Sequence, residues 1–156
     1  MDETDLVIAI REFNREEDEP YIYASWRNAS YYSALDRPKQ DPKAYFKAKT
    51  REIKDLLDQA HVRIACIQET PIVIVGYAVS IGDHLEMIFV KPDYRRKGIG
   101  KMLCPKWVRT YTDKLTKIGK LIADKNCLTL TGEPGGNELS GSHKEIQSIK
   151  TRRFYL

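Results

Sequence analysis

Residues 90–101 read VKPDYRRKGIGK, and this stretch decides the fold of the chain. A β-rich run ends at Val90, basic side chains fill positions 95–97, and glycines at 98 and 100 open a segment with apolar residues at helical spacing. Glycine lets the backbone approach a ligand closely, and the free N–H groups of a first helical turn attract anions. The stretch therefore predicts an anion-binding loop between a strand and a helix.

Two familiar phosphate-binding fingerprints do not fit this loop. A P-loop needs Ser or Thr after its Gly-Lys pair, where this chain has Met102. A dinucleotide-binding loop needs a third glycine, where this chain has Leu103. The basic side chains of residues 95–97 still suit a pyrophosphate, because cations bind its oxygens with charge-assisted hydrogen bonds.

The pattern Arg95-x-x-Gly98-x-Gly100, after a strand that ends Val90-x-Pro92, resembles the acetyl-CoA loop of the GNAT superfamily of N-acetyltransferases. The order of predicted elements over residues 6–131 resembles that family too. The resemblance implies an α+β fold with a mixed central sheet of about six or seven strands and helices on both faces. It implies a single domain over residues 1–156, with the motif loop and helix at 90–115 and an atypical part at 132–156.

Hydrophobic periodicity and turn residues predict the elements themselves. Helices are expected at 21–30 after the acidic run 16–19 and Pro20, from Asp41-Pro42 to about residue 60, and from Gly98 to about residue 116 with a kink or a late start at Pro105. Strands are expected at 6–13, 61–69, 72–80, 84–90, 121–124, 127–131 and 152–156.

The resemblance implies acetyl-CoA as co-substrate and no metal. The backbone of Phe89 and Val90 is expected to pair with the pantetheine arm, and the amides from Arg96 to Lys101 are expected to surround the pyrophosphate. The implied cofactor-binding residues are Phe89, Val90, Arg95, Arg96, Lys97, Gly98, Ile99, Gly100 and Lys101. The side chains of residues 95–97 either reach the 3′-phosphate or are ordinary solvated charges.

Acetyl transfer needs a neutral amine, and a lysine-like amine is neutral only about once in 2,500 at pH 7, a penalty of ~4.6 kcal/mol. His84 and Glu86 share one face of the strand at 84–90, and we predict that they supply the base, with Glu86 ranked first. The opposite face is expected to be wholly apolar: Leu85, Met87 and Phe89. In the related family a glutamate or histidine at one of these positions commonly serves as base. Alternatively, the pair simply reaches solvent, or Glu86 pairs with Arg63.

Aromatic side chains near the acidic run 16–19 suit a cationic amine, and we predict Tyr23, Trp26 and Tyr31 as acceptor-binding residues. The alternative is that Tyr23 and Trp26 are core residues of a short helix. The expected partner is an amine-bearing acceptor, a small molecule or a protein, and a homodimer stays open. The proton for the leaving thiolate could come from water, Tyr94 or Tyr155, because the family's usual tyrosine motif has no match in the tail.

Composition excludes several classes of protein. The 156 residues are 42% hydrophobic and 31% charged, unlike a disordered chain. The longest apolar runs are far below the ~18 residues that a membrane span needs. Cys66, Cys104 and Cys127 lie far apart, so we expect neither a disulfide framework nor a zinc site. The first ten residues, MDETDLVIAI, carry acids where a signal peptide has lysines, which predicts a cytoplasmic protein.

Charge is distributed unevenly along the chain. Residues 1–60 carry 10 basic and 13 acidic side chains, whereas residues 61–156 carry 16 and 9. Such a basic half fits a bound anion, and the rival explanation is a nucleic-acid-binding module that uses 95–101, 114–120 and 150–153. No recognition helix or stacking pattern accompanies these residues, so we do not expect a nucleic-acid partner. A third hypothesis is a catalytically degenerate GNAT fold that binds CoA.

The tail is expected to divide into two parts. Four glycines fall within residues 132–142, a density that no packed helix tolerates, which predicts a mobile surface loop beside the acceptor. Residues 143–150 are expected to form one or two helical turns. Residues 152–156 alternate between apolar and polar side chains, which predicts an edge strand.

Overall fold

The computed structural model describes residues 5–32, 41–126, 128–130 and 151–155, and the predicted features at 132–142 and 143–150 lie outside them. The strands are β1 (Asp5–Glu12), β2 (His61–Ile67), β3 (Thr70–Ile81), β4 (His84–Val90), β5 (Thr110–Tyr111), β6 (Thr129–Leu130) and β7 (Thr151–Tyr155). The helices are α1 (Arg15–Tyr32), α2 (Pro42–Leu57), α3 (Ile99–Leu103) and α4 (Lys117–Lys125), with a 3₁₀ turn, η1 (Pro92–Tyr94).

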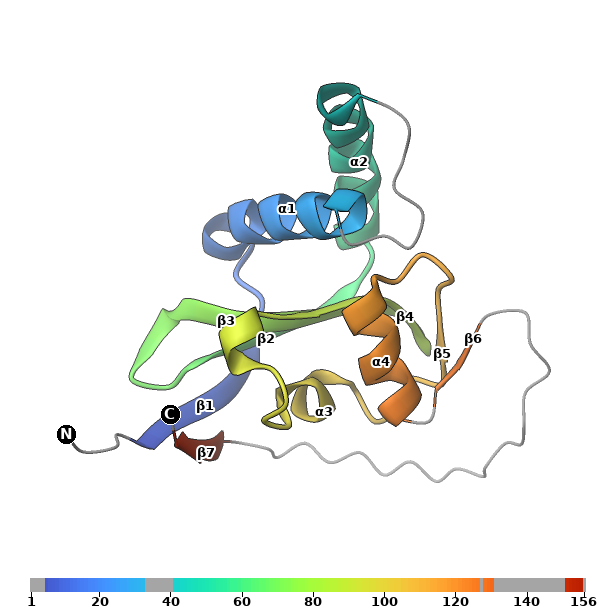
Figure 1. Cartoon of the computed structure of the whole chain (residues 1–156). Coiled ribbons are helices and arrows are strands. Elements are labelled where there is room, and N and C mark those ends of the chain that lie inside the picture. Colours follow the sequence, from blue (N-terminus) through green and yellow to red (C-terminus); the bar gives the residue numbers. More distant parts are fainter. Residues whose placement is uncertain (1–4, 33–40, 127, 131–150, 156) are drawn as a thin grey trace.

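All seven strands form one mixed sheet in the order β6-β5-β4-β3-β2-β1-β7. The pairs β4–β5 and β5–β6 are parallel, and the other neighbours are antiparallel. Helices α1 and α2 cover one face of the sheet, and α3 and α4 cover the other (Figure 1). This arrangement confirms the mixed sheet with helices on both faces that the sequence predicts.

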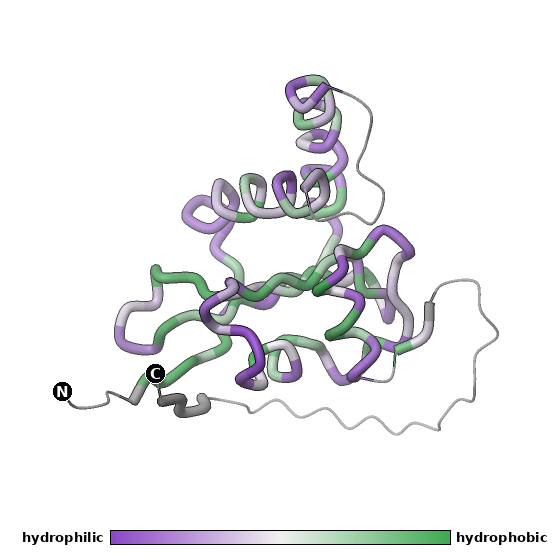
Figure 2. Tube along the Cα trace, viewed as in Figure 1, coloured by the Kyte–Doolittle hydropathy of each residue, from purple (hydrophilic) through white to green (hydrophobic). Residues whose placement is uncertain are grey.

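The central strands are largely hydrophobic (Figure 2), and their buried side chains form one core layer on each side of the sheet. On the side of α1 and α2, Ile22 and Ile53 of the helices pack against Tyr77 of β3, and all three are fully buried. On the other side, Ile99 and Leu103 of α3 pack against Val75 of β3. The sheet is therefore held from both faces.

Helix α1 is longer than predicted at both ends. It begins at Arg15 because Asn14 caps it: the Asn14 side chain accepts a hydrogen bond from the Glu17 amide at 3.3 Å, and the Asn14 amide donates to Asp18 at 2.7 Å. Pro20 lies inside the helix, where it costs one backbone hydrogen bond without ending it. The acidic run is thus the first turn of the helix, where it meets the positive end of the dipole.

Helix α2 confirms its predicted start. The Asp41 carboxylate accepts from the amides of Lys43 and Ala44, and Pro42 occupies the first helical position.

The long helix predicted from Gly98 to residue 116 is wrong. Helix α3 ends at Leu103 because Cys104 precedes Pro105 and is extended, with ψ 116°. Arg63 of β2 closes the helix end, donating to the carbonyls of Leu103 at 3.0 Å and Met102 at 2.9 Å. The chain then forms β5, a strand that the sequence pattern did not reveal.

The strand predicted at 121–124 is also wrong, since these residues belong to α4. The Thr116 side chain caps this helix by accepting from the Gly119 amide at 3.0 Å. A buried Ala123 packs the helix on the sheet, while Leu121 is 57% exposed. The apolar run at 121–123 was too short to separate a strand from one face of a helix.

Strand β7 confirms the predicted edge strand at the end of the chain. It pairs antiparallel with β1 from Asp5↔Tyr155 to Ala9↔Thr151. The sheet therefore has the last strand of the chain at one edge and β6 at the other.

Candidate functional site

Strands β4 and β5 separate after a short parallel contact. They pair only at His84↔Thr110 and Leu85↔Tyr111, and β4 then continues to Val90. In the described part of the chain, no strand pairs with the β5-facing edge of β4 from Met87 to Val90, which we call the open β4 edge. An extended ligand could pair there with the backbone of Val90, as expected for a pantetheine arm, and with that of Ile88. The backbone of Phe89 faces Tyr77 of β3 instead, because the bond from the Lys91 amide to the Val75 carbonyl sets the hydrogen-bonded pairs of this ladder.

A β-bulge lies in β4 beside the open edge. Val79 pairs with Met87 and Ser80 pairs with Leu85, so Glu86 is the extra residue. The bulge reverses the alternation: Leu85 packs on the α3 and α4 side, whereas Met87 packs on the α1 and α2 side. The prediction that Leu85, Met87 and Phe89 form one apolar face is therefore wrong.

The structure brings His84 and Glu86 together as predicted. The His84 Nε2 atom lies 3.6 Å from Glu86 Oε2, and the two side chains are 26% and 19% exposed. His84 Nδ1 also lies 2.7 Å from the Thr110 hydroxyl. The alternative pairing of Glu86 with Arg63 is wrong, because Arg63 binds the end of α3. Thr110 was missed because β5 was not predicted.

The loop after β4 exposes a run of backbone donors. Arg96 has φ 66° and Gly98 has φ 86°, left-handed conformations of the kind found in backbone loops that bind anions. The amides from Arg96 to Lys101 donate no hydrogen bond to another described residue. Helix α3 has only five residues, so its dipole is weaker than the predicted long helix would give. Anion attraction therefore depends on the loop amides and the nearby cations.

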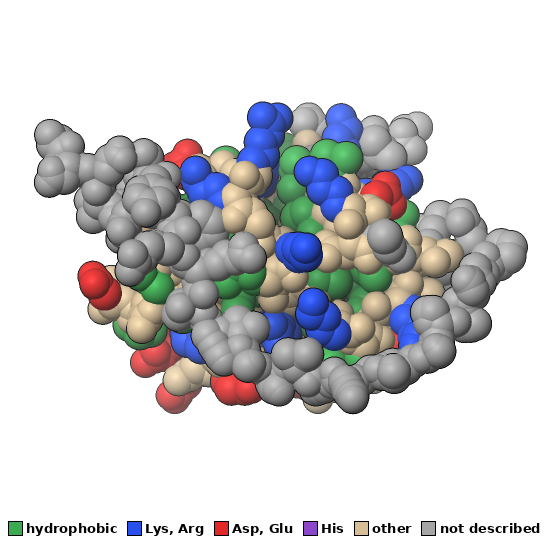
Figure 3. Space-filling view, turned by 90° about the horizontal axis from the view of Figure 1, so that it is seen from below, with side chains coloured by type: hydrophobic (Ala, Val, Ile, Leu, Met, Phe, Trp, Pro, Cys, Tyr) green, Lys and Arg blue, Asp and Glu red, His purple; other side chains and the backbone are tan. Residues whose placement is uncertain are grey.

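The basic side chains of the loop have different environments. Arg95 donates from Nε to the carbonyl of Val90 at 2.8 Å, so it holds the loop against β4. Arg96 is exposed and Lys97 is half-buried, and neither makes an ion pair with a described residue. In Figure 3, which shows the face with α3 and α4, Lys and Arg side chains stand across its middle. Lys97 and Arg96 are thus the loop cations available to a phosphate.

Gly100 serves packing between helices. A Cβ atom at this position would lie 2.8 Å from Cγ2 of Ile122 in α4. A bulky residue at Gly100 would therefore disturb the fold as well as any ligand. Gly98 needs glycine for its backbone angle.

Tyr21 of α1 lies over the β4 end of the sheet. Its ring contacts Phe89 and Tyr77 at centroid distances of 6.4 and 6.2 Å, and the Lys91 ammonium lies 5.4 Å from its centroid. Burial raises the pKa of Tyr21 to about 12, so the phenol stays neutral. The α1 and α2 side of β4 therefore carries a cluster of aromatic rings next to the Lys91 ammonium.

The predicted acceptor residues Tyr23, Trp26 and Tyr31 do not gather at the open β4 edge. Trp26 is 4% exposed in the core, and Tyr31 is 7% exposed among aromatic rings of α1 and α2. Tyr23 packs at the rim of the same core. These positions favour the core role. Tyr94 packs on the α3 side of the sheet, and the side chain of Tyr155 lies outside the described residues.

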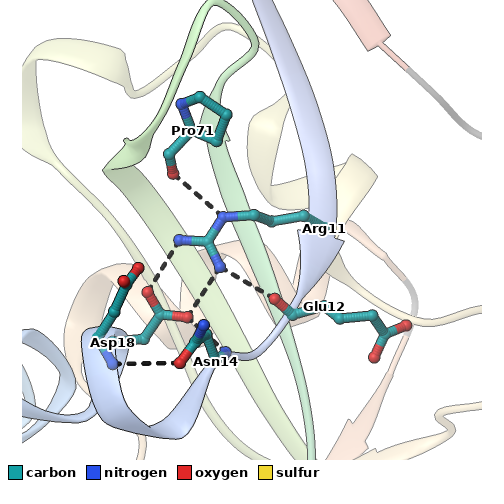
Figure 4. Close-up of polar contacts among 6 residues, drawn as sticks. Arg11, Glu12, Asn14, Asp18 and Pro71 are labelled. Carbon is teal, nitrogen blue, oxygen red and sulfur yellow. Dashed lines mark hydrogen bonds and ion pairs between the residues drawn. The ribbon is translucent and has the colours of Figure 1, made fainter.

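A hollow of about 570 Å³ lies elsewhere, at the start of α1, lined by residues 11–14, Glu17, Pro71 and Ile72. Figure 4 shows the Arg11 guanidinium there between Pro71 and Asp18. Arg11 donates to both carboxylate oxygens of Asp18 at 2.8 Å and to the Pro71 carbonyl at 3.1 Å. Its charge is therefore used to join β1 to α1, and β2 and β3 separate the hollow from β4.

Among the residues that the structure describes, no three His, Cys, Asp or Glu side chains are grouped to hold a metal ion. Within the same residues, no helix has both the length and the apolar character to cross a bilayer.

Comparisons with known proteins match this architecture to one family. A family model described as an acetyltransferase (GNAT) domain matches residues 39–126, more than half of the chain. A peptidyl-lysine N-acetyltransferase, YjaB of Salmonella typhimurium, is 33% identical over 100 residues, which are 63% of this chain and 63% of that protein. The match thus spans less than two thirds of this relative's length.

Two solved structures are similar at lower identity. The solution structure of apo YjaB from Escherichia coli has 23% identity and a TM-score of 0.43, covering 62% of this chain and 60% of that one. A GCN5-related N-acetyltransferase from Rhodopseudomonas palustris has 24% identity and a TM-score of 0.48, covering 83% and 74%.

Proposed function

This chain belongs to the GNAT family of acetyltransferases, and from that membership we propose that it transfers an acetyl group from acetyl-CoA to a primary amine by direct attack in a ternary complex. The observation that carries the proposal is the run of amides from Arg96 to Lys101, which donate to no other described residue, next to the open β4 edge. Together they offer donors for a pyrophosphate and a strand edge, unpaired among the described residues, for an amide-bearing arm.

In this proposal the loop and β4 hold acetyl-CoA. The loop amides donate to the pyrophosphate oxygens, and the cations of Arg96 and Lys97 add charge-assisted bonds to phosphate. The backbone groups of Ile88 and Val90, which point away from β3, pair with the pantetheine amides. Arg95 contributes indirectly, because its bond to the Val90 carbonyl keeps the loop close to the strand.

The proposed chemistry needs one proton acceptor. The amine nitrogen attacks the thioester carbonyl, a C–N bond forms, the C–S bond breaks, and CoA leaves as a thiolate that takes up a proton. Glu86 accepts the amine's proton, directly or through a water, with His84 at 3.6 Å beside it. The carboxylate thereby offsets part of the ~4.6 kcal/mol that deprotonating a lysine costs at neutral pH.

We assign the acceptor to the class of lysine side chains in peptides. The relative at 33% identity is named a peptidyl-lysine N-acetyltransferase. In this chain the Glu86 carboxylate lies on β4, and the aromatic ring of Tyr21 contacts Phe89 near the end of the same strand. A carboxylate and an aromatic ring both suit an ammonium group.

Calorimetry with acetyl-CoA tests the cofactor site. Lys97→Ala should weaken binding by about 3- to 30-fold, the loss of one charge-assisted contact to phosphate. The matched control is Lys47→Ala, which removes an exposed lysine of α2 and should leave the affinity unchanged. Equal affinities in the two variants would contradict the assignment of the loop.

The two alternative functions predict different results in binding and acetylation experiments. A nucleic-acid-binding module would bind DNA or RNA with steep salt dependence and ignore acetyl-CoA. A degenerate GNAT fold would bind acetyl-CoA and acetylate no amine.

A further inference from the structure

Thr110 of β5 lies against the imidazole ring of His84 at the start of β4. Strand β5 runs parallel to β4 with Thr110 opposite His84, and the Thr110 hydroxyl lies 2.7 Å from His84 Nδ1. On the far side of the same ring, Nε2 faces Glu86 Oε2 at 3.6 Å. The imidazole is therefore placed between a hydroxyl and a carboxylate.

The backbone holds Thr110 firmly. Its amide donates to the Asp83 carbonyl at 3.2 Å, and its other neighbour is Thr129 of β6. The hydroxyl is thus presented to His84 from the middle strand of three parallel strands, β4, β5 and β6, rather than from a loop. A group held in this way can keep a neighbouring ring in one orientation.

The chemistry of the two neighbours selects one form of the neutral ring. An ionised carboxylate only accepts hydrogen bonds, whereas a hydroxyl both donates and accepts. When the proton is on Nε2, that N–H faces the Glu86 carboxylate, which can only accept. The Nδ1 lone pair then accepts a hydrogen bond from the Thr110 hydroxyl. With the proton on Nδ1 instead, the Nε2 lone pair would face the negative charge of Glu86.

We infer that Thr110 is a positioning residue that holds His84 in the Nε2–H tautomer and aims that N–H at Glu86. The inference rests on the proposed function for its purpose: Glu86 accepts the amine's proton, and His84 orients the carboxylate that does so. The 3.6 Å separation shortens to a hydrogen bond when substrates bind, as catalytic contacts in ligand-free enzymes often do. A hydroxyl also fits this role when the ring becomes charged, because it can rotate to accept from Nδ1–H.

Nitrogen-15 NMR of the histidine rings in the ligand-free protein tests the inference, with the His84 signals assigned by their loss in His84→Gln. The wild type and Thr110→Ser should show the Nε2–H tautomer, and Thr110→Val should show a mixture of both tautomers. Thr129→Val is the matched control on the adjacent strand and should resemble the wild type. A wild-type Nδ1–H tautomer, or an unchanged spectrum in Thr110→Val, would overturn the inference.

Kinetics supply the second readout. Thr110→Val should lower kcat by about 10- to 100-fold with the acetyl-CoA affinity unchanged, because a base is misoriented while the loop is intact. Thr110→Ser should restore kcat, which lost packing alone would not allow; a serine variant as slow as the valine variant contradicts the inference. The spectra are recorded without substrate. If they show the predicted tautomer but the protein transfers no acetyl group, only the proposed function is overturned.

Discussion

Asp18 of α1 accepts a hydrogen bond from each terminal nitrogen of Arg11 in β1, both at 2.8 Å, while its side chain is only 1% exposed. Burial acts to raise the pKa of this carboxyl, but the bonds from Arg11 and from the Asn14 amide outweigh it and leave the pKa below its ordinary value. Because Arg11 also donates to Pro71, the pair fixes α1 and the β2–β3 hairpin to β1.

Asp18→Asn should lower the free energy of unfolding at about pH 7 by about 2–4 kcal/mol, since it leaves the guanidinium without its partner. A carboxyl whose pKa is lowered by folding stabilises the protein at pH values above its unfolded-state pKa. This stabilisation is lost as the pH falls through its folded-state pKa. Urea unfolding should therefore show the difference from wild type shrinking toward about pH 3. Glu17→Gln, one residue away and exposed, is the control; a difference that is constant with pH would contradict the account.

Gly100→Ala should destabilise the protein by about 1–2 kcal/mol, because its Cβ would lie 2.8 Å from Cγ2 of Ile122. In an Ile122→Ala background the same change should cost little, since the clashing atoms are gone. A double-mutant cycle by thermal unfolding measures this coupling. Additive effects would show that α3 and α4 do not restrict each other here.

Removing residues 151–156 should cost about 2–4 kcal/mol, because the ladder between β7 and β1 is lost and the β1 edge is opened. Unfolding in denaturant provides the measurement, and a protein that lacks only residue 156 is the control. Equal midpoints in both proteins would mean that β7 adds nothing to the sheet.

Glu86→Gln should lower turnover by ~10²–10⁴ and leave acetyl-CoA binding intact. The loss should be smaller near pH 10, where about a third of a lysine-like amine is already neutral. Glu69→Gln, on the exposed β2–β3 turn, should retain wild-type rates at both pH values. The same loss at every pH would indicate that Glu86 positions or packs rather than accepts a proton.

The sequence predicted the parts of the fold that depend on local patterns. The Asp41-Pro42 start of α2 is set by neighbouring residues, and the structure confirms it. The loop at 95–100 was also identified, because its glycines and cations are contiguous. Strand periodicity placed His84 beside Glu86, and the structure shows the two side chains together, although the bulge at Glu86 interrupts that periodicity.

Other features depend on contacts between distant segments and left no pattern to read. The β4 bulge places Glu86 outside the ladder by shifting the register against β3, which no spacing within β4 reveals. Thr110 meets His84 only because the chain turns at Pro105 and returns as β5. Tyr21 meets Phe89 only because α1 packs over β4, a strand far away in the sequence.

The most direct test of the account is mass spectrometry of a lysine-containing peptide incubated with the purified protein and acetyl-CoA, with free CoA thiol measured in parallel. The account predicts one acetyl group on the lysine side chain for each thiol released, with both signals reduced by ~10²–10⁴ in Glu86→Gln. Acetyl-CoA that binds but yields neither acetyl-lysine nor free thiol above the uncatalysed rate, on any amine supplied, would contradict it.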